Sequence, residues 1–422
     1  MLFRQNLPFI EEFVTSLELG LQNHHPNEKL SRKQKAFLSF CLMGILVTNS
    51  VCWARFERAS LGQYATAALS WMFRKAKIPW EKLLNTGISI ILERYKLNEG
   101  VLVTDDTDHK RSKKTTKIAF THKVYDKKTG GYFNGQSIVF LLLVTPKVTI
   151  PVGFSFYTPD PAIKSWEKEE RKLKKKGLPK KERPPKPERN PAHPTKMELA
   201  ERLIGNFREA HPSIKIKAVC ADNLYATAEF VDGIKDVLGC QVLGTLKGNQ
   251  KVRFKGKNLS MSEYFRQNPP IERTMRIRGE EEAKVFFHSA RLYVPSHGKK
   301  RHLVALRYEE QEEWRYLCAA DLGWRTIDIV QAWTLRWLVE VFIEDFKVDE
   351  GWGQLAKQQG VEGASRGVVL SLLLDLALIL HPQQQARLKA QKPACTVGSL
   401  LRLVRTEALV LFLKSLLVGK TG

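Results

Sequence analysis

Paired cysteines and long apolar runs, which would mark a secreted or a membrane protein, are both missing from this sequence of 422 residues. The six cysteines are scattered without a Cys-x-x-Cys pair, so we expect reduced thiols rather than disulfides or a zinc site. The longest apolar stretches, Phe37–Val47 and Val368–Leu380, have 11 and 13 residues, whereas a membrane-spanning helix needs about 18 or more. The first residues also lack the pattern of a signal peptide. We therefore expect a cytoplasmic protein without a membrane partner.

Acidic residues are also scarce relative to basic ones. The chain has 68 Lys and Arg against 44 Asp and Glu, which gives a formal net charge of +24. Hydrophobic residues make up 43% and charged residues 27%, which is ordinary for a folded protein and excludes wholesale disorder. A folded chain with this excess of positive charge is expected to bind a polyanion, and nucleic acid is the first choice.

The first half of the chain changes character along its length. Residues 1–98 show helical periodicity, and three strand-like runs follow at Gly100–Asp106, Tyr132–Val144 and Val148–Tyr157, which favour an antiparallel meander. The segment Lys164–Lys196 then holds 13 Lys and Arg against 5 Asp and Glu, together with six prolines. Such a composition cannot bury a core and predicts a solvated helix followed by an extended loop.

The second half returns to regular structure. Lys215–Ala221 is typical of a buried strand, and the short alternating segments between Val242 and Leu317 predict a mostly β block. Asp328–Gly351 has the pattern of one strongly amphipathic helix, and Gly360–Leu380 and Val397–Val418 are also expected to be helical.

Acidic residues stand at positions where an apolar element ends or is interrupted. Asp106, with Asp105 beside it, closes the first strand-like run, and Asp222 follows Lys215–Ala221. Glu340 lies inside an otherwise apolar and aromatic helix. Taken singly, Asp105 and Asp106 are also consistent with a solvated turn, and Asp222 is also consistent with a helix N-cap.

The helix that contains Glu340 carries an unusual stripe. Trp333, Arg336, Glu340, Glu344 and Lys347 recur at steps of three and four residues, so they share one face. Arg336 and Glu340 have the spacing of an ordinary helix ion pair, and this reading is compatible with a second role. A face with aromatic, acidic and basic groups is better explained by a charged ligand than by a plain core.

Three carboxylates that converge from strand ends and a helix have a chemical meaning. Mg²⁺ is a hard cation that takes oxygen ligands, often one or two carboxylates together with water and substrate phosphates. Two such ions about 4 Å apart activate the attacking oxygen and stabilise the leaving oxygen at a phosphodiester. The basic background would then hold the nucleic acid while the local acids hold the metal.

The spacing on the acidic helix resembles a known signature. Trp333-x2-Arg336-x3-Glu340-x6-Lys347 is similar to the Tyr-x2-Arg-x3-Glu-x6-Lys motif of the bacterial DDE transposases grouped around the insertion-sequence-four family, with Trp in place of Tyr. Because indole is only a hydrogen-bond donor, any contact made through the Tyr hydroxyl is in doubt here.

Two further segments extend the resemblance. VTDDTD resembles the family's first-aspartate motif, in which the catalytic Asp precedes Thr or Ser, and this favours Asp106 over Asp105. ADNLYAT resembles the second motif, an Asp at a strand end with a Tyr three residues on, here Asp222 and Tyr225. The match covers roughly residues 100–382.

The resemblance implies an α/β fold with an RNase H-like catalytic core, an inserted β-rich domain, and helical regions at both ends. Asp222 and Glu340 are 118 positions apart, which leaves room for the insertion. The implied division has a helical DNA-binding domain at 1–98, the core in two parts at 99–235 (with the basic loop 164–196) and 326–385, the insertion at 236–325, and a C-terminal dimerisation region at 386–422.

The resemblance also implies the chemistry. Asp106, Asp222 and Glu340 would ligate two Mg²⁺ or Mn²⁺ ions, and water would free a 3′-OH at the transposon end that then attacks target DNA. The implied partners are double-stranded DNA, as inverted-repeat ends and as target, and a second copy in a homodimeric synaptic complex, near the bacterial nucleoid. The DNA contacts that we expect are Arg336 and Lys347, the aromatic residues Trp333, Trp314 and Tyr225, the cluster His109, Lys110, Arg111, Lys113 and Lys114, and Arg74 and Lys75.

Two alternatives to a transposase remain open at the level of sequence. A metal-dependent nuclease on the same core would cut DNA without joining it. A catalytically silent DNA-binding regulator derived from a transposase would bind ends without chemistry. Trp314, at the end of the β block, could be a core aromatic residue or a platform for a flipped base. The basic segment 164–196 could be a solubilising loop or a DNA-facing insertion.

Overall fold

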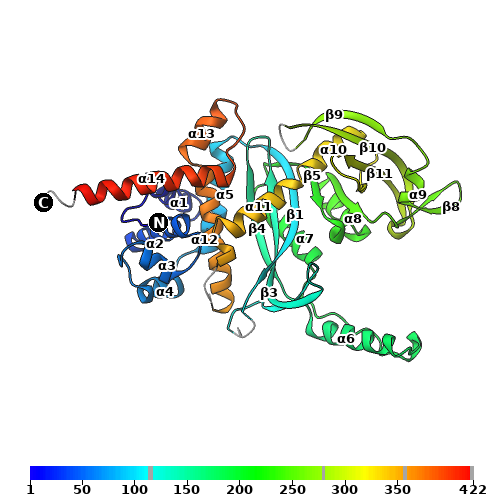
Figure 1. Cartoon of the computed structure of the whole chain (residues 1–422), viewed down its shortest axis with the longest axis horizontal. Helices are drawn as coiled ribbons and strands as arrows, with labels where there is room; N and C mark the ends of the chain where they lie inside the picture. Colours follow the sequence, from blue (N-terminus) through cyan, green and yellow to red (C-terminus); the bar gives the residue numbers. More distant parts are fainter. Residues whose placement is uncertain (113–116, 278–280, 355–358, 419–422) are drawn as a thin grey trace.

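The computed structural model describes residues 1–112, 117–277, 281–354 and 359–418. The chain is a mixed α/β protein in which a large mixed sheet runs from the middle of the molecule to one end, and helices gather at the other end (Figure 1). Segments far apart in the sequence meet there, because the N-terminal helices and the C-terminal helices occupy the same side of the sheet.

The N-terminal region is helical, as the sequence predicts. Its second helix begins at a capping box, in which Ser31 accepts from the Gln34 backbone N–H and the Gln34 side chain accepts from the Ser31 backbone N–H. The helices are α1 (Pro8–His24), α2 (Arg32–Thr48), α3 (Trp53–Ala59), α4 (Thr66–Lys75) and α5 (Trp80–Arg94).

The central part of the sheet contains the antiparallel meander expected from the sequence. Strand β3 pairs antiparallel with β1 on one edge and with β4 and β2 on the other, and β5 and β6 then follow parallel to β1. The strands are β1 (Glu99–Lys110), β2 (His122–Asp126), β3 (Gly131–Val144), β4 (Thr149–Tyr157), β5 (Lys215–Ala221) and β6 (Gln241–Leu246). Between β4 and β5 lie α6 (Pro161–Lys175), η1 (Lys180–Glu182) and α7 (Lys196–Ala210).

Strand β1 is longer than the sequence suggests. The expectation that Asp106 closes this strand is wrong, because pairing with β3 continues as far as Lys110 opposite Gly135. Pairing with β5, in contrast, ends at Thr104 opposite Ala221. Asp106 therefore lies inside the strand but beyond the point where its parallel neighbour stops.

The predicted β block extends the same sheet instead of forming a separate one. Strand β12 pairs with β6, and β11, β10, β7 and β8 follow in that order. The elements of this part are α8 (Ala228–Leu238), β7 (Lys251–Phe254), β8 (Lys257–Ser260), α9 (Met261–Phe265), β9 (Ile271–Ile277), β10 (Glu281–Val294), η3 (Pro295–His297), β11 (Lys299–Tyr308) and β12 (Arg315–Ala319). Arg301 of β11 is buried and donates two hydrogen bonds of 2.8 Å to the carboxylate of Asp232 of α8.

The single helix predicted for Asp328–Gly351 is two helices. The first, α10 (Thr326–Thr334), ends before Leu335, and α11 (Trp337–Val348) begins after Arg336. The backbone N–H groups of Leu335 and Arg336 bond three residues back, at 3.3 and 3.0 Å, which is the tighter 3₁₀ pattern. The chain continues with η4 (Trp352–Gln354), α12 (Gly360–Ile379), α13 (Pro382–Lys389) and α14 (Val397–Val418).

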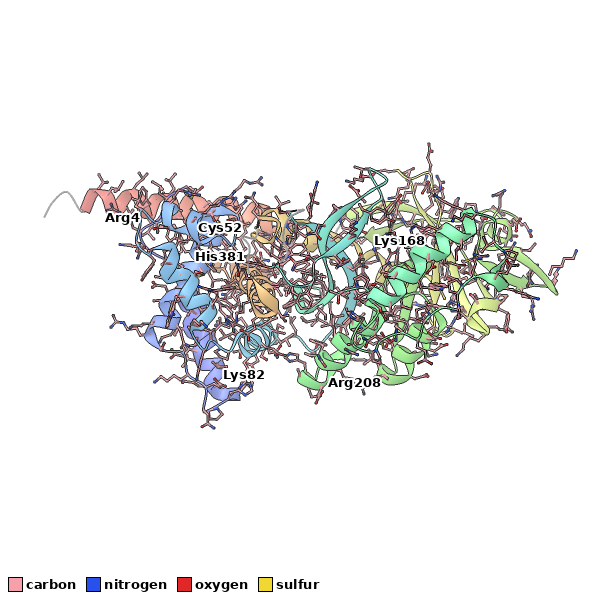
Figure 2. The ribbon with its side chains drawn as sticks, turned by 90° about the horizontal axis from the view of Figure 1, so that it is seen from below. Arg4, Cys52, Lys82, Lys168, Arg208 and His381 are labelled. Atoms are coloured by element: carbon pink, nitrogen blue, oxygen red, sulfur yellow. The ribbon has the colours of Figure 1, made fainter. Side chains whose placement is uncertain are left out.

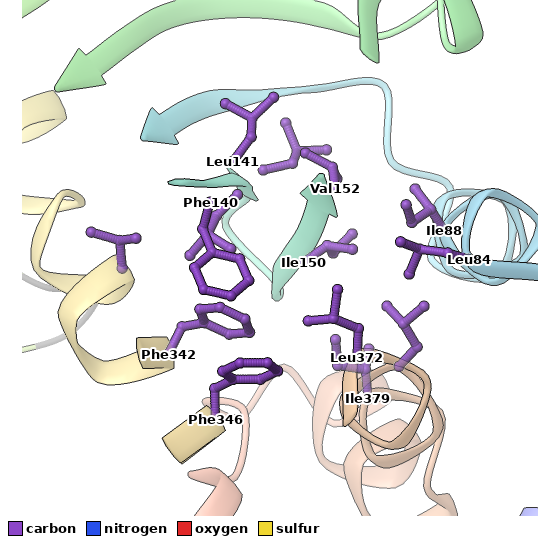
Figure 3. Close-up of a cluster of buried hydrophobic side chains, with 14 of the residues drawn as sticks. Leu84, Ile88, Phe140, Leu141, Ile150, Val152, Phe342, Phe346, Leu372 and Ile379 are labelled. Atoms are coloured by element: carbon purple, nitrogen blue, oxygen red, sulfur yellow. The ribbon is translucent and has the colours of Figure 1, made fainter. Parts of the chain in front are cut away.

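One continuous apolar core joins the sheet to the helices of both chain ends. Figure 3 shows Leu84 of α5, Phe140 of β3 and Leu372 of α12 facing the same interior, with Phe342 and Phe346 of α11 below Phe140 and in edge-on contact with it. The ring centroids of Phe342 and Phe346 lie 5.3 and 5.1 Å from that of Phe140, so α11 is fixed against the sheet. This packing sets the position of the acidic helix.

In the described part of the chain, no single helix combines the length and the apolar character needed to cross a bilayer. Two bent helix pairs, α2 with α3 and α12 with α13, have the necessary length and apolar composition only when the two helices of each pair are counted together.

Candidate active site

The neighbouring acids Asp105 and Asp106 point to opposite faces of the sheet, as successive residues of a strand do. Asp105 lies opposite Phe140 of β3, and cross-strand partners share a face. Because the ring of Phe140 contacts Phe342 and Phe346, Asp105 faces α11. Asp106 faces the side that α7 covers, where Lys196 contacts it.

A single guanidinium lies at the centre of the acids on the α11 face. Arg336 Nη2 is 2.8 Å from Asp105 Oδ2 and 4.0 Å from Asp222 Oδ2, and Nη1 bonds Glu340 Oε1. Carboxylates from β1, from the end of β5 and from α11 therefore gather around one positive charge. The break between α10 and α11 is what places Arg336 at this point.

Burial and the charges of neighbouring side chains set the protonation of Asp105 and Arg336. Burial raises the pKa of Asp105 to about 6, although the Arg336 charge acts in the opposite direction. Burial also disfavours the charged form of Arg336, but Asp105, Asp222 and Glu340 together hold its pKa above the usual value. Arg336 is thus a permanent cation that offsets the repulsion among the acids.

Asp106 has a different set of partners. Lys196, the first residue of α7, bonds Asp106 Oδ2, and the Tyr225 hydroxyl donates to Asp106 Oδ1 at 3.4 Å. Tyr225 is fully buried, and burial together with the nearby acids raises the pKa of its hydroxyl. The side chain of Asp106 is therefore already engaged by a cation and a hydroxyl group on the far face.

Asp222 keeps an accessible carboxylate. Its side chain is 48% exposed, and Asp222 Oδ1 accepts a hydrogen bond of 3.1 Å from Thr245 Oγ1 on β6. The Asp222 side chain does not cap the following helical turn. It is the Asp222 backbone carbonyl that accepts from the Tyr225 backbone N–H, at 2.9 Å. The Thr245 hydroxyl orients the carboxylate toward Arg336.

Lys347 and His109 both lie close to the indole ring of Trp352. Lys347 Nζ lies 6.0 Å from the centre of the Trp352 ring, and the His109 ring lies 4.7 Å from it. Burial lowers the pKa of Lys347, and the charge of Asp108 opposes that effect. Burial lowers the pKa of His109 to about 3, so His109 is neutral at physiological pH. This neutral, half-buried ring packs against protein, while Lys347 stays close to β1.

The three aromatic candidates for DNA contact differ in exposure. Tyr225 and Trp333 are buried, and the Arg336 guanidinium lies 5.6 Å above the Trp333 ring. Trp314 is half-buried, with Arg307 5.5 Å and His288 5.3 Å from its ring. In this conformation only Trp314 offers part of its ring to a ligand.

The basic candidates differ in accessibility. Lys110 of β1 and Arg74 and Lys75 at the end of α4 are exposed. Arg111 is half-buried, and its Nε donates to Gln136 Oε1 at 2.8 Å. Lys113 and Lys114 lie outside the described residues.

Reasoning from the sequence did not single out Lys196 or Thr245 and ranked Asp105 below Asp106. A local signal for Lys196 exists, because Thr195 and Glu198 form a capping box that starts α7 at residue 196. That signal locates the helix, but nothing local indicates that its first residue meets a strand 90 positions earlier.

The donors around Arg336 suit a hard divalent cation in kind. All three are carboxylates, the ligands that Mg²⁺ and Mn²⁺ favour. Among the described residues, no group of three or more His, Cys, Asp or Glu is already gathered closely enough to hold a metal ion. The acids instead surround the Arg336 guanidinium, which contributes one positive charge where a divalent metal would contribute two.

Comparison with models of protein families gives a match over more than half of the chain. A family model described as DDE superfamily endonuclease matches residues 57–327. The matched span contains Asp105, Asp106 and Asp222 and ends before α11. No curated protein matches the chain.

Proposed function

Because the chain belongs to the DDE superfamily endonucleases, we propose that it is a transposase that cuts DNA at the ends of its element and joins the freed 3′-OH to target DNA. Membership implies a DNA substrate and an RNase H-like core, and members typically use divalent metals. The observation that carries the proposal is the gathering of Asp105, Asp222 and Glu340 around Arg336. The Trp-Arg-Glu-Lys spacing on α10 and α11 supports a place near the insertion-sequence-four group.

The metal-binding carboxylates that we propose are those of Asp105, Asp222 and Glu340. Asp105 replaces Asp106 in this set because it shares the α11 face with Glu340, whereas Asp106 is engaged by Lys196. The three oxygen donors fit a divalent metal, since they already surround a cation. A bound pair of Mg²⁺ or Mn²⁺ ions would activate the attacking oxygen and stabilise the leaving oxygen.

The residues of the chain itself would bind and orient the DNA. Arg336 holds the acids together before DNA arrives, and its guanidinium would donate hydrogen bonds to a phosphate oxygen at the cleavage point. Lys347, held near β1 by the Trp352 ring, supplies a second phosphate contact. The hydrogen bond from Thr245 keeps the Asp222 carboxylate turned toward the reacting phosphate.

The domain division follows the same proposal. The helical region 1–98, with Arg74 and Lys75 exposed at the end of α4, would recognise the element ends. The core would comprise 99–235 and 326–385, and the β-rich part would be its insertion. Because β6 pairs parallel with β5, we extend the first part of the core from 235 to Leu246, so that the insertion begins after Leu246 and not at 236. A DNA substrate would place the protein with the chromosome in the bacterial cytoplasm.

A plasmid carrying the DNA that flanks the coding region on both sides tests the function. With Mg²⁺, the wild-type protein should nick at the element ends and join them to a second plasmid, and Glu340→Gln should lower both products at least about 10³-fold, because a metal supplies several kcal/mol to the transition state. End binding, measured by gel shift, should stay within a few-fold of wild type.

Two results would contradict a transposase. Cleavage that never yields a joined product would indicate a nuclease. End binding by the wild-type protein without any Mg²⁺- or Mn²⁺-dependent cleavage would indicate a silent regulator.

We also propose that the protein acts as a homodimer through α14. This helix carries a row of exposed apolar side chains, in which Leu403, Val410, Leu413 and Leu417 recur at seven, three and four residues. This is the spacing of a helix-to-helix seam. Figure 1 shows α14 extending past the other helices, so a second copy has access to this row.

Charge placed in that row should separate the protomers. The double variant Leu413→Glu/Leu417→Glu should sediment as a monomer at concentrations where wild type is a dimer, because it buries like charges at the seam. Lys414→Glu, on the same helix beside the row, should leave the dimer intact. A double variant that sediments like wild type would remove α14 from the interface.

A further inference from the structure

A helical arm projects from the sheet between β4 and α7. Its helix, α6, contains 15 residues, all of them described, and none is buried. Figure 1 shows α6 standing away from the body of the molecule, and in Figure 2 the same helix, labelled at Lys168, is uncovered by other elements. We define the arm as residues 161–183.

The base of the arm is held in place by specific contacts. Asp160 caps α6 by accepting from the Ala162 backbone N–H at 2.9 Å, and Trp166 Nε1 donates to the Pro184 carbonyl at 2.9 Å. Arg183 forms an ion pair with Glu170, which ties the returning chain to the helix. The arm is therefore an ordered projection.

The tip of the arm is closed by its own turn. Gly177 takes the left-handed conformation with φ +77°, and the Leu178 backbone N–H bonds back to the Leu173 carbonyl at 3.2 Å. This is the Schellman ending of a helix, which Gly permits at low cost. The side chains at the tip are thus displayed on a defined backbone.

The charge of the arm is divided between base and tip. Lys164 and Arg183 are paired with Glu167 and Glu170 near the base. The tip, residues 172–181, has no acidic residue and holds six exposed lysines, none of which forms an ion pair with any described residue. These lysines are Lys172, Lys174, Lys175, Lys176, Lys180 and Lys181.

An ordered tip of this kind is costly when nothing binds it. Six like charges at the end of α6 and on the chain that follows it repel one another. A solubilising loop would need neither an ordered backbone nor the contacts that hold the base of the arm. Lysine ammonium groups act as point charges without the planar fork that reads bases, so they suit a phosphate backbone in a sequence-independent way.

The arm is rooted near the acids. Tyr157, the last residue of β4, lies opposite Ser137, which in turn lies opposite Asp108 of β1, three residues beyond Asp105. With strands about 4.8 Å apart and about 3.3 Å per residue, the root lies about 15 Å from Asp105. The 15 residues of α6 add about 22 Å at 1.5 Å each.

We propose that the lysine tip of the arm binds the phosphate backbone of duplex DNA beside the cleavage point and within about 11 base pairs of it, at 3.4 Å per base pair. This proposal rests on the DNA substrate of the proposed function and adds to it a contact surface outside the acidic site. The tip secures the duplex by charge alone, while the acids and Arg336 engage the scissile phosphate.

Replacing all six lysines with Gln tests the proposal on the full-length protein. Affinity for an element-end duplex, measured between 50 and 200 mM salt, should depend less on salt, with the log–log slope smaller by about 3 or more, since each phosphate contact contributes about 0.9. Hydroxyl-radical protection should disappear at a flanking position within about 11 base pairs of the cleavage point and persist at the cleavage point itself.

The matched control replaces the same six lysines with Arg. It keeps the charge and should retain the wild-type slope and footprint, and circular dichroism should show unchanged helix content in both variants because α6 buries no side chain.

The possible failures can be told apart. A Gln variant with wild-type slope and footprint overturns the arm contact alone. Loss of binding to phosphatidylserine vesicles with DNA binding unchanged would assign the tip to a membrane surface instead. A wild-type protein that does not bind the duplex at all would overturn the proposed function and the arm contact together.

Discussion

Replacement of Asp105 with Asn should abolish metal-dependent DNA cleavage, whereas Asp106→Asn should leave it within about tenfold of wild type. Asp105 faces Glu340 across Arg336, at 2.8 Å from the guanidinium, and Asn has one neutral amide oxygen in place of the negatively charged carboxylate that a divalent metal favours. Because a metal contributes several kcal/mol to the transition state, the expected loss is at least about 10³-fold.

The smaller effect at Asp106 follows from its partners. Its carboxylate bonds Lys196 and accepts from Tyr225 on the opposite face of β1, so Asn removes an ion pair and leaves the acids around Arg336 in place. We expect a loss of stability for this variant, because Lys196 is then left without its counter-ion.

Two measurements separate the variants. Cleavage of the element-end plasmid gives the rate, and the shift of the melting temperature on addition of Mn²⁺ reports binding without turnover. Asp105→Asn should lose both responses and Asp106→Asn should keep both. The reverse pattern would return the first metal-binding role to Asp106 and would refute our assignment.

A second large effect is a loss of stability between about pH 4 and pH 7 that arises in the core. Glu350, which follows α11, is 0% exposed, and Asp375 of α12 is 4% exposed. Burial raises the pKa of Asp375 to about 7 and that of Glu350 well above its usual value, and the two carboxyls influence each other. Asp345 adds a further negative charge nearby.

The direction of the effect follows from proton counting. Between about pH 4 and pH 7 the folded chain retains a proton on Asp375 that the unfolded chain releases, so the free energy of unfolding falls as the pH rises. The contribution is complete below about pH 4 and lost above about pH 7. Because Glu350 and Asp375 influence each other, this pH dependence belongs to the pair and not to either carboxyl alone.

Urea unfolding at several pH values between 4 and 8 measures this. Asp375→Asn should flatten the fall in the free energy of unfolding and should be more stable than wild type at pH 8. Glu12→Gln, the same chemical change at an exposed position of α1, should keep the wild-type pH dependence. A steep fall that persists in Asp375→Asn would show that its carboxyl is not responsible.

Much of the local structure could be read from the sequence because it depends on neighbours in the chain. The β-branched runs around residues 132–157 predicted the meander, and the lysines and prolines of 164–196 predicted an exposed helix and loop, since such a composition cannot bury a core. The spacing from Arg336 to Glu340 predicted that the two share a face, and they form an ion pair.

Other features depend on contacts between distant segments, which periodicity does not specify. Strand alternation separates Asp105 from Asp106, but only the packing of Phe140 on α11 decides which of them faces Glu340. The tightened turn at Leu335 and Arg336, which divides the helix predicted for Asp328–Gly351, is likewise not specified by the periodicity of the segment.

The sequence by itself therefore determined the chemical class of the groups present: carboxylates in a strongly basic chain, on strands and on an amphipathic helix. Only the tertiary structure decided which carboxylates meet, that Arg336 stands between them, and that Asp375 is buried away from water. The physical reason is that side-chain type and periodicity are local properties. Convergence and burial arise only when separate segments of the chain pack against one another.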